Sequence, residues 1–210
     1  SSAMLYAANL GNKALTGDAK TSFHGKLMSR LKDLEAQVND MLLFAKSGEQ
    51  QVVEKLSLQQ LLSEVKLGSE AMMNLNHAEL IIELPEPDIE ITGNKTALAG
   101  AIGNLIHNSV QIIGKGAHVV LSASRDPSVE NGVVISVSDN GPGVPLDLQQ
   151  KIFEPFFTTR SQGTGLGLAV VNSIATSHQG RVSLVNNPHQ GATFNIHIPV
   201  FPTTVGSEES

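Results

Sequence analysis

The chain changes character near residue 50, and this change constrains its fold more than any other feature. Before it, apolar residues recur at intervals of four and three: Leu27, Leu31, Leu34, Val38, Met41 and Ala45. This a/d pattern is typical of a helix packed in a coiled coil or a four-helix bundle. Residues 1–10 form another apolar helical stretch, separated from the first by Gly11 and Thr16–Asp18. Residues 1–48 therefore predict a helical hairpin that dimerises to bury its apolar faces, or else packs on the rest of its own chain.

After a polar linker over residues 49–57, helix and strand patterns alternate up to residue 200, and a polar tail covers 201–210. Apolar periodicity predicts helices at 58–73, 95–113 and 165–178, and short runs predict strands at 79–84, 89–92, 117–124, 133–138, 181–185 and 192–198. We expect Gly114 and Gly180 to end two of the helices. The last two strands are expected to pair as a hairpin. The predicted fold class is α+β.

Composition excludes several classes of protein. The chain is 40% hydrophobic and 16% charged, so it can bury a core. Its net charge of −6 argues against a general nucleic-acid binder. No apolar run is long enough to span a bilayer, and no signal peptide opens the chain, so we expect a cytoplasmic segment without membrane contact. With no cysteine, neither a thiolate zinc site nor a cysteine nucleophile is possible.

Asn104 and Asn108 lie four residues apart in the predicted helix 95–113. This spacing places both amides on one helix face. An amide oxygen is a hard ligand that suits Mg²⁺, which takes its other ligands from water and nucleotide phosphates. The alternative is that both amides are solvated or hydrogen-bonded locally.

A second motif, Asp139-Asn-Gly-Pro-Gly143, directly follows the predicted strand 133–138. A carboxylate at a strand end can accept a hydrogen bond from the exocyclic amine of adenine, whereas guanine presents a carbonyl there. Gly141 and Gly143 permit backbone angles closed to other residues and let the chain approach a flat base. An ordinary turn is the alternative, because Asp-Gly and Pro-Gly segments are common in turns.

A third motif, Gly163-Thr-Gly-Leu-Gly167, opens the predicted helix 165–178. Its glycines let ligand oxygens reach backbone N–H groups, and the helix N-terminus favours phosphate. The spacing matches neither the dinucleotide fingerprint nor the P-loop, and a flexible loop is the alternative. Just upstream, Phe153, Phe156 and Phe157 can anchor a mobile lid to the core or the hairpin, and Arg160 can reach a phosphate.

In this order, the motifs resemble those of the ATP-binding domain of two-component sensor histidine kinases, which is akin to gyrase. Asn104–Asn108 resembles the family's N box, Asp139–Gly143 its G1 box, Phe153–Phe157 its F box and Gly163–Gly167 its G2 box, and Gly191–Phe194 also matches. The resemblance covers about residues 56–200, and residues 1–48 resemble the dimerisation hairpin that precedes this domain. It implies a Bergerat fold over 58–200: an α/β sandwich of a mixed sheet with helices on one face.

The resemblance also implies ATP and Mg²⁺ as cofactors. The implied ATP-binding residues are Asn104, Asn108, Asp139, Gly141, Gly143, Phe157, Thr158, Thr159, Arg160, Gly163, Thr164, Gly165, Leu166 and Gly167. Among them, Asn104, Asn108 and Arg160 would be catalytic, and Asn108 would coordinate Mg²⁺. Asn104 stands where gyrase-like ATPases carry a water-activating Glu; an amide is a poor base, so we expect slow hydrolysis and transfer of the γ-phosphoryl to a histidine. Gln111 stands where many histidine kinases place Lys, which leaves Arg160 as the expected phosphate contact.

The short lid resembles that of nitrogen-regulatory and flagellar sensor kinases, whose partners are response regulators that activate sigma-54 promoters. The resemblance thus implies a homodimer through the hairpin and a response regulator of this type as partner. The family's accepting His, with its following Arg and Pro, is expected just before Ser1. Among the histidines present, His24, His107 and His178 lack that context. We therefore expect a truncated chain that binds ATP without phosphorylating itself.

Two other functions remain open on the sequence. A chaperone-like ATPase clamp would hydrolyse ATP to drive a conformational change, but Asn104 in place of Glu and the small size disfavour it. A scaffold module with a degenerate pocket is disfavoured by the intact motifs.

Overall fold

The computed structural model describes residues 20–28, 31, 53–128, 131–160, 163–187 and 190–200. The chain divides into two compact units, Ser1–Leu42 and Leu43–Ser210. In the first unit, residues 20–28 are helical and His24 is exposed. Most of the predicted hairpin and its apolar stripe, and the tail 201–210, lie outside the described residues, so the domain boundaries, the hairpin and its dimerisation stay predictions.

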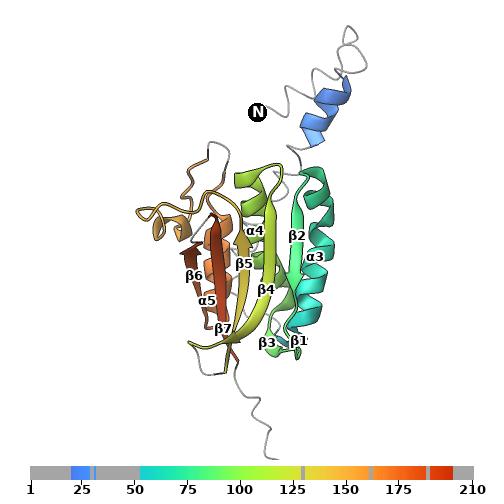
Figure 1. Ribbon diagram of the computed structural model, residues 1–210. Helices are drawn as coiled ribbons and strands as arrows, with labels where there is room; N and C mark the ends of the chain where they lie inside the picture. Colours follow the sequence, from blue (N-terminus) through green and yellow to red (C-terminus); the bar gives the residue numbers. More distant parts are fainter. Residues whose placement is uncertain are drawn as a thin grey trace, which may run out of the picture. The chain divides into compact units, whose positions relative to one another are not determined.

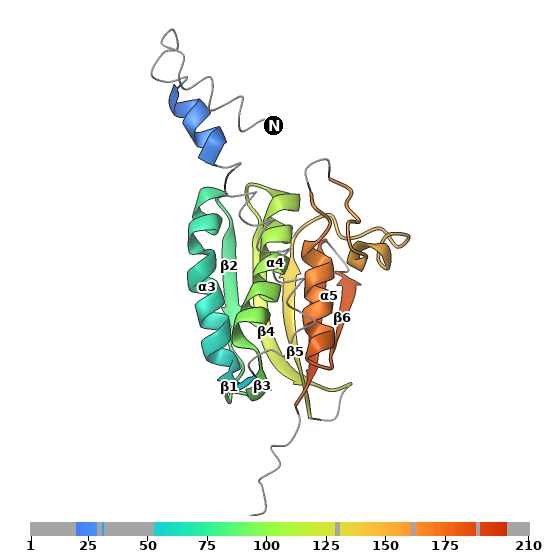
Figure 2. The same cartoon turned by 180° about the vertical axis from the view of Figure 1, so that it is seen from behind.

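The second unit contains a mixed five-stranded sheet with helices on one face, as expected (Figures 1 and 2). The strand order is β2-β4-β5-β7-β6; β2 and β4 are parallel, and the other neighbours are antiparallel. The elements of this sheet are β2 (Glu79–Glu83), β4 (His118–Asp126), β5 (Gly132–Asp139), β6 (Arg181–Asn186) and β7 (Ala192–Pro199), and the helices are α3 (Leu58–Leu75), α4 (Lys95–Ile113) and α5 (Gly167–Ser177). A short 3₁₀ turn, η1 (Lys151–Phe153), precedes the lid.

The predicted helices and strands are confirmed, with ends that differ by a few residues. Side-chain caps explain two of the helix starts: Ser57 accepts the Gln60 N–H before α3, and Asn94 accepts the Ala97 N–H before α4. Gly114 ends α4 with a positive φ of 75°, as expected. The predicted hairpin of β6 and β7 is also confirmed.

Two local predictions need correction. The stretch 49–57, expected to be a linker, contains strand β1 (Glu54–Ser57), which pairs antiparallel with β3 (Glu90–Gly93) in a separate two-stranded sheet. Gly180 is not the left-handed residue after α5; Gln179 takes that conformation, with φ 58°. Gly180 is instead required by close packing, because a Cβ there would lie 2.0 Å from the His197 carbonyl oxygen.

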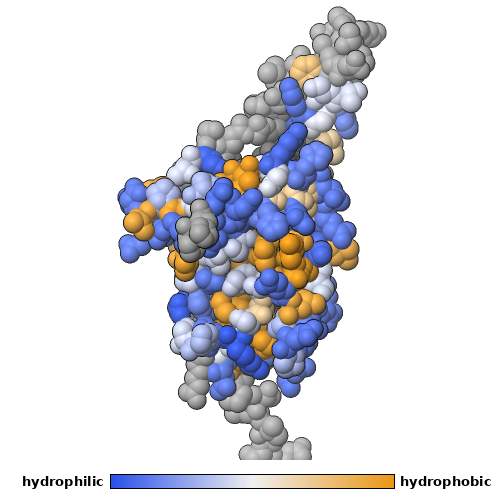
Figure 3. Space-filling model, in the orientation of Figure 1, coloured by the Kyte–Doolittle hydropathy of each residue, from blue (hydrophilic) through white to orange (hydrophobic). Residues whose placement is uncertain are grey.

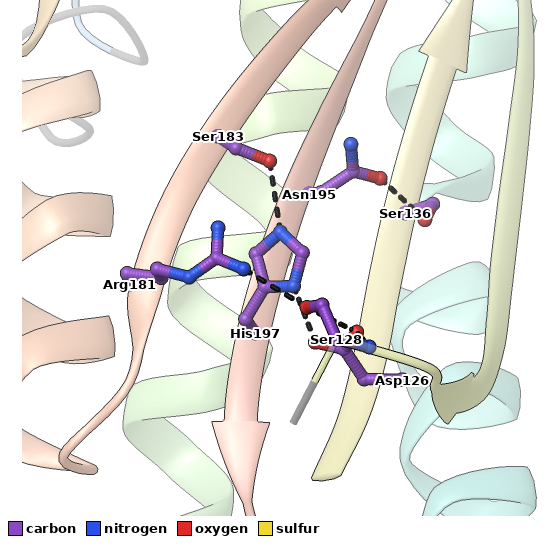
Figure 4. Close-up of polar contacts among 7 residues, drawn as sticks. All are labelled: Asp126, Ser128, Ser136, Arg181, Ser183, Asn195 and His197. Atoms are coloured by element: carbon purple, nitrogen blue, oxygen red, sulfur yellow. Dashed lines mark hydrogen bonds and ion pairs between the residues drawn. The ribbon is translucent and has the colours of Figure 1, made fainter. Parts of the chain in front are cut away.

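The core lies between the sheet and the three helices. Leu98, Ile102 and Leu105 of α4 are at most 1% exposed, and they face strand residues such as Ile135, which is fully buried. Residues of β5 and β7 alternate between this core and the opposite face of the sheet. That opposite face, seen in Figure 3, carries both polar and apolar side chains. Its polar members include Ser136, which donates a hydrogen bond to Asn195 at 2.7 Å (Figure 4).

Candidate functional site

Asp139 is the last residue of β5 and points toward the helices. Strand alternation explains this direction, because Val133, Ile135 and Val137 are buried in the core and Asp139 continues the same side of the strand. Two backbone N–H groups donate to its Oδ1, from Gly141 at 2.9 Å and from Ala192 at 3.2 Å. The carboxylate is therefore held in place by the loop after its own strand and by the start of β7.

The other carboxylate oxygen has room for a ligand. The hydroxyl of Ser109, a buried residue of α4, lies 3.0 Å from Asp139 Oδ2 and 3.2 Å from the Leu105 carbonyl, so its single proton is shared between two acceptors. Among the described residues, Asp139 has no ion pair and no other donor at Oδ2. Since a carboxylate oxygen accepts about two hydrogen bonds, Oδ2 keeps the capacity to accept one from a bound molecule.

Glycines surround this carboxylate where other residues would not fit. A Cβ on Gly191 would lie 1.8 Å from the Asp139 carbonyl oxygen, and a Cβ on Gly141 would lie 2.9 Å from Asp139 Oδ1. The same Cβ on Gly141 would also lie 3.2 Å from the side chain of Ile113, at the end of α4. Gly143 has a positive φ of 76° and lies against the Asn186 side chain. Glycine backbone and the Ile113 side chain thus pack closely around Asp139 and the loop that follows it.

Two amide residues of α4, Asn104 and Asn108, precede Ser109 on the same helix. Asn104 donates from Nδ2 to the carbonyl of Gly167, the first residue of α5, at 3.5 Å. The half-buried Asn108 side chain makes no hydrogen bond within the part of the chain that the structure describes. Its oxygen is therefore available to a ligand, as the metal-binding prediction requires.

Residues 156–160 and 163–167, together called the lid here, contact one another. The Phe156 N–H donates to the Gly165 carbonyl at 2.9 Å, and a Cβ on Gly165 would lie 2.4 Å from the carbonyl carbon of Phe156. Thr158 accepts from the Arg160 N–H at 3.1 Å, and a Cβ on Gly163 would lie 2.5 Å from this hydroxyl. Gly163 and Gly165 of the third motif are therefore needed for the fold of the lid.

Arg160 joins the lid to α4, because its guanidinium Nη1 donates to the side-chain oxygen of Gln111. The guanidinium is half-buried, and this burial lowers its pKa. Within the lid, the Thr164 hydroxyl accepts the N–H of the buried Leu166 at 3.3 Å.

Two of the predicted ATP-binding residues make no polar or ring contact of this kind through their side chains in the described ranges, and their role stays a prediction. Thr159 is exposed, and neither its side chain nor that of Phe157 makes a hydrogen bond or ring contact within the described residues. Of the three phenylalanines expected to anchor a lid to the core or to the hairpin, Phe153 packs edge-on against the buried Phe194 with ring centroids 6.4 Å apart. Phe156 is 70% exposed, so it does not reach the core of its own unit.

Sequence reasoning missed several residues of the site. Ser109 and Ile113 belong to the same helix as the two asparagines, and their role depends on contacts with the loop after β5. For Gln111, the sequence indicated only that it stands where many histidine kinases carry Lys. Its contact with Arg160 joins residues that are 49 positions apart in sequence. Ser109 could have been found from its place beside Asn108, but the pairing of Gln111 and Arg160 carries no local signal.

Comparison with known proteins identifies this arrangement. Residues 93–202 match the family described as histidine kinase-, DNA gyrase B- and HSP90-like ATPase. The chain belongs to this ATPase family. The matched residues include α4, Asp139 and its glycines, the lid and α5, so the site described above lies wholly inside the family's domain.

Individual relatives of this ATPase-family chain are sensor kinases. Sensor protein kinase FleS of Pseudomonas aeruginosa is 35% identical over 204 residues, which cover 96% of this chain and 49% of that protein. The catalytic domain of histidine kinase ThkA is 28% identical with a TM-score of 0.65, covering 71% of this chain and 96% of that one. Full-length ShkA in complex with AMPPNP is 28% identical with a TM-score of 0.71, and the match covers 94% of this chain and 42% of that one. The chain thus spans about half the length of FleS.

Proposed function

We propose that this chain is the ATP-binding catalytic region of a sensor histidine kinase, which passes the γ-phosphoryl of ATP to a histidine and thence to a response regulator. The observation that carries the proposal is the Asp139 carboxylate, held by two backbone N–H groups and Ser109, with acceptor capacity left on Oδ2. Membership of the ATPase family and the kinase relatives support it. So does ShkA, a relative whose structure holds AMPPNP.

Base selection is assigned to Asp139. A carboxylate offers only acceptors, so it pairs with the exocyclic amine of adenine and repels the carbonyl that guanine presents at that position. The two backbone donors prevent the carboxylate from turning away, because rotation would leave both N–H groups without their acceptor. The site should therefore prefer ATP to GTP.

The phosphates and Mg²⁺ are assigned to the lid side of α4. Bound Mg²⁺ would neutralise phosphate charge, and Asn108 fits it because its half-buried amide oxygen has no partner in the described part of the chain. The first N–H groups of α5 suit phosphate oxygens, since Leu166 provides no side-chain cap there, whereas α3 and α4 are capped. Arg160 supplies the positive charge.

Asn104 favours transfer over hydrolysis. It replaces a carboxylate that would activate water, and its amide already donates to the Gly167 carbonyl. An amide cannot take a proton from water, so the bound triphosphate should hydrolyse slowly. This disfavours the chaperone-like ATPase clamp, which needs ATP hydrolysis to drive its conformational change.

The receiving histidine and the partners belong to the same proposal. Of His24, His107 and His178, two form hydrogen bonds within the described chain. His178 accepts the Asn94 N–H at 2.9 Å, and His107 forms a hydrogen bond with Gln111 at 2.8 Å. We propose that the acceptor lies on the hairpin of the whole kinase, that the hairpin forms the homodimer, and that the catalytic event is cytoplasmic. Mg²⁺, the response regulator and its sigma-54 activator type rest on the resemblance of the motifs. None of the helices in the described ranges combines the length and the apolar character that a membrane span requires.

Calorimetric titration of the chain with ATP and with GTP, each with MgCl₂, tests the proposal. We expect saturable ATP binding at micromolar to submillimolar concentration and GTP binding weaker by at least about tenfold, the value of one hydrogen bond to a charged group. Absence of ATP binding would support the scaffold alternative. Equal binding of both nucleotides would show that Asp139 does not read the base, and steady-state hydrolysis faster than about one per second would support the clamp.

A further inference from the structure

Three amide side chains lie on one face of α4, spaced by four and three residues: Asn104, Asn108 and Gln111. Asn104 and Gln111 each contact the lid, at Gly167 and at Arg160 respectively. Asn104 bonds the Gly167 carbonyl, and Gln111 accepts a hydrogen bond from Arg160. Asn108 lies between them without a hydrogen bond in the described residues. The lid is therefore attached to α4 on both sides of the proposed Mg²⁺ ligand.

The Arg160 guanidinium needs an anion that the described chain does not supply. It is half-buried, and its only hydrogen bond from the side chain in those residues is the one from Nη1 to Gln111. No carboxylate there forms an ion pair with it. A guanidinium carries five N–H donors in a flat fork, so one edge can rest on Gln111 while the other stays available. Withdrawing a cation from water without an anion is costly, so the available edge fits a phosphate.

Gln111 is itself oriented by a third residue. Its amide nitrogen lies 2.8 Å from His107 Nε2, one helical turn earlier on α4. An amide nitrogen can only donate, so His107 Nε2 accepts and the amide oxygen of Gln111 must face Arg160. Gln111 is neutral, and it therefore directs the guanidinium without neutralising its charge.

We propose that Gln111 is a positioning residue, which directs the lid arginine, Arg160, at the terminal phosphates of the nucleotide beside Asn108. The inference rests on the proposed function, because it takes ATP as the ligand. It goes further than the proposed function because it assigns a role to the neutral Gln111, at a position where many histidine kinases carry a lysine. Its consequence is that the effect of Gln111 depends on the β- and γ-phosphates and vanishes for AMP.

Two substitutions separate positioning from simple attachment of the lid. Gln111→Ala removes the acceptor, and we expect ATP affinity to fall about five-fold, because Arg160 must then be ordered on binding. Gln111→Glu keeps an acceptor and holds Arg160 more tightly, but it neutralises the cation and places a negative charge near the phosphates. We expect Gln111→Glu to weaken ATP binding by about thirty-fold or more.

The experiment is a titration of the 210-residue chain with ATP by calorimetry and with AMP by NMR shift changes. AMP affinity should stay within about two-fold of wild type in both variants, because the Asp139 end of the site is untouched. Gln150→Glu is the charge control, since Gln150 is exposed and its side chain caps no helix. In an Arg160→Ala background, Gln111→Ala should cost nothing further.

The outcomes distinguish this inference from the proposed function. Wild-type binding of ATP together with a Gln111→Glu variant that binds ATP as well as wild type would overturn the positioning role alone. Equal losses for ATP and AMP would overturn it too, because they would indicate a general structural defect. If the wild-type chain bound neither nucleotide, the proposed function would fail and this inference would fail with it.

Discussion

Acid should weaken the sheet through one buried carboxylate, Asp126, at the end of β4. It is 6% exposed and accepts hydrogen bonds from the Ser128 N–H at 2.8 Å, the Ser128 hydroxyl at 2.6 Å and His197 Nδ1 at 2.6 Å (Figure 4). Burial raises its pKa, but the bonds from Ser128 and His197 outweigh burial and lower the pKa from 3.8 to about 2. The charged form is therefore favoured in the folded protein.

The size and sign of the effect follow from linkage. Each unit of pKa corresponds to about 1.4 kcal/mol, so the ionised Asp126 contributes up to about 2 kcal/mol to the free energy of unfolding. Between pH 4 and 2 the unfolded chain binds the proton and the folded chain does not. The contribution is thus complete above about pH 5 and is lost as the pH falls through about 4 to 2.

The assay compares urea unfolding of wild type and Asp126→Asn at several pH values. Far-UV circular dichroism is the suitable signal, because the chain has no Trp and its single Tyr, Tyr6, precedes the sheet unit in sequence. The difference in unfolding free energy should be about 2 kcal/mol at pH 6, should fall to about 1 kcal/mol or less near pH 2.5 and should approach zero only below about pH 2. Asp147→Asn, at an exposed position, is the control and should show no such trend. A difference that stays constant or grows as the pH falls would refute the reasoning.

Three further substitutions test other contacts. His178→Ala should lower the unfolding free energy by about 1–2 kcal/mol, because it removes the acceptor of the Asn94 N–H at the start of α4; urea unfolding measures this, and no loss would contradict it. Ser109→Ala should weaken ATP binding about three-fold in calorimetry, since Asp139 loses its hydroxyl donor, and unchanged affinity would exclude this role. Asn108→Ala should make ATP affinity the same with MgCl₂ and with EDTA, because the proposed Mg²⁺ ligand is removed. A retained Mg²⁺ dependence would indicate that other residues bind the metal.

Local patterns predicted most elements of the second unit, Leu43–Ser210. The periodicity of 95–113 and the alternation of Val133, Ile135 and Val137 show which face of the helix and of the strand is buried. Such patterns can be read from the sequence because the spacing of neighbouring apolar residues determines the buried face. The same alternation places Asp139 on the helix side of the sheet, so the position of the proposed base-reading residue was predictable. Strand β1 was missed because Glu54–Ser57 has a single apolar residue, Leu56, and is stabilised by pairing with β3.

Contacts between distant residues could not be predicted in this way. The sheet places β7 between β5 and β6, an order that depends on packing of the whole chain. The bond between His197 and Asp126 spans 71 residues, and that between Arg160 and Gln111 spans 49. Gly180 illustrates the same limit: a glycine after a helix suggests a left-handed cap, whereas its actual constraint is the His197 carbonyl of another strand.

The most direct test of the account is ATP binding by Asp139→Asn. The asparagine keeps an oxygen for the Gly141 and Ala192 N–H groups, so the fold should be retained, but it replaces the free acceptor with an NH₂ donor that faces the adenine amine. Calorimetry with Mg-ATP should show a loss of at least about thirty-fold relative to wild type and to Asp147→Asn, with unchanged circular dichroism. Wild-type affinity in Asp139→Asn would contradict the assignment of the adenine site.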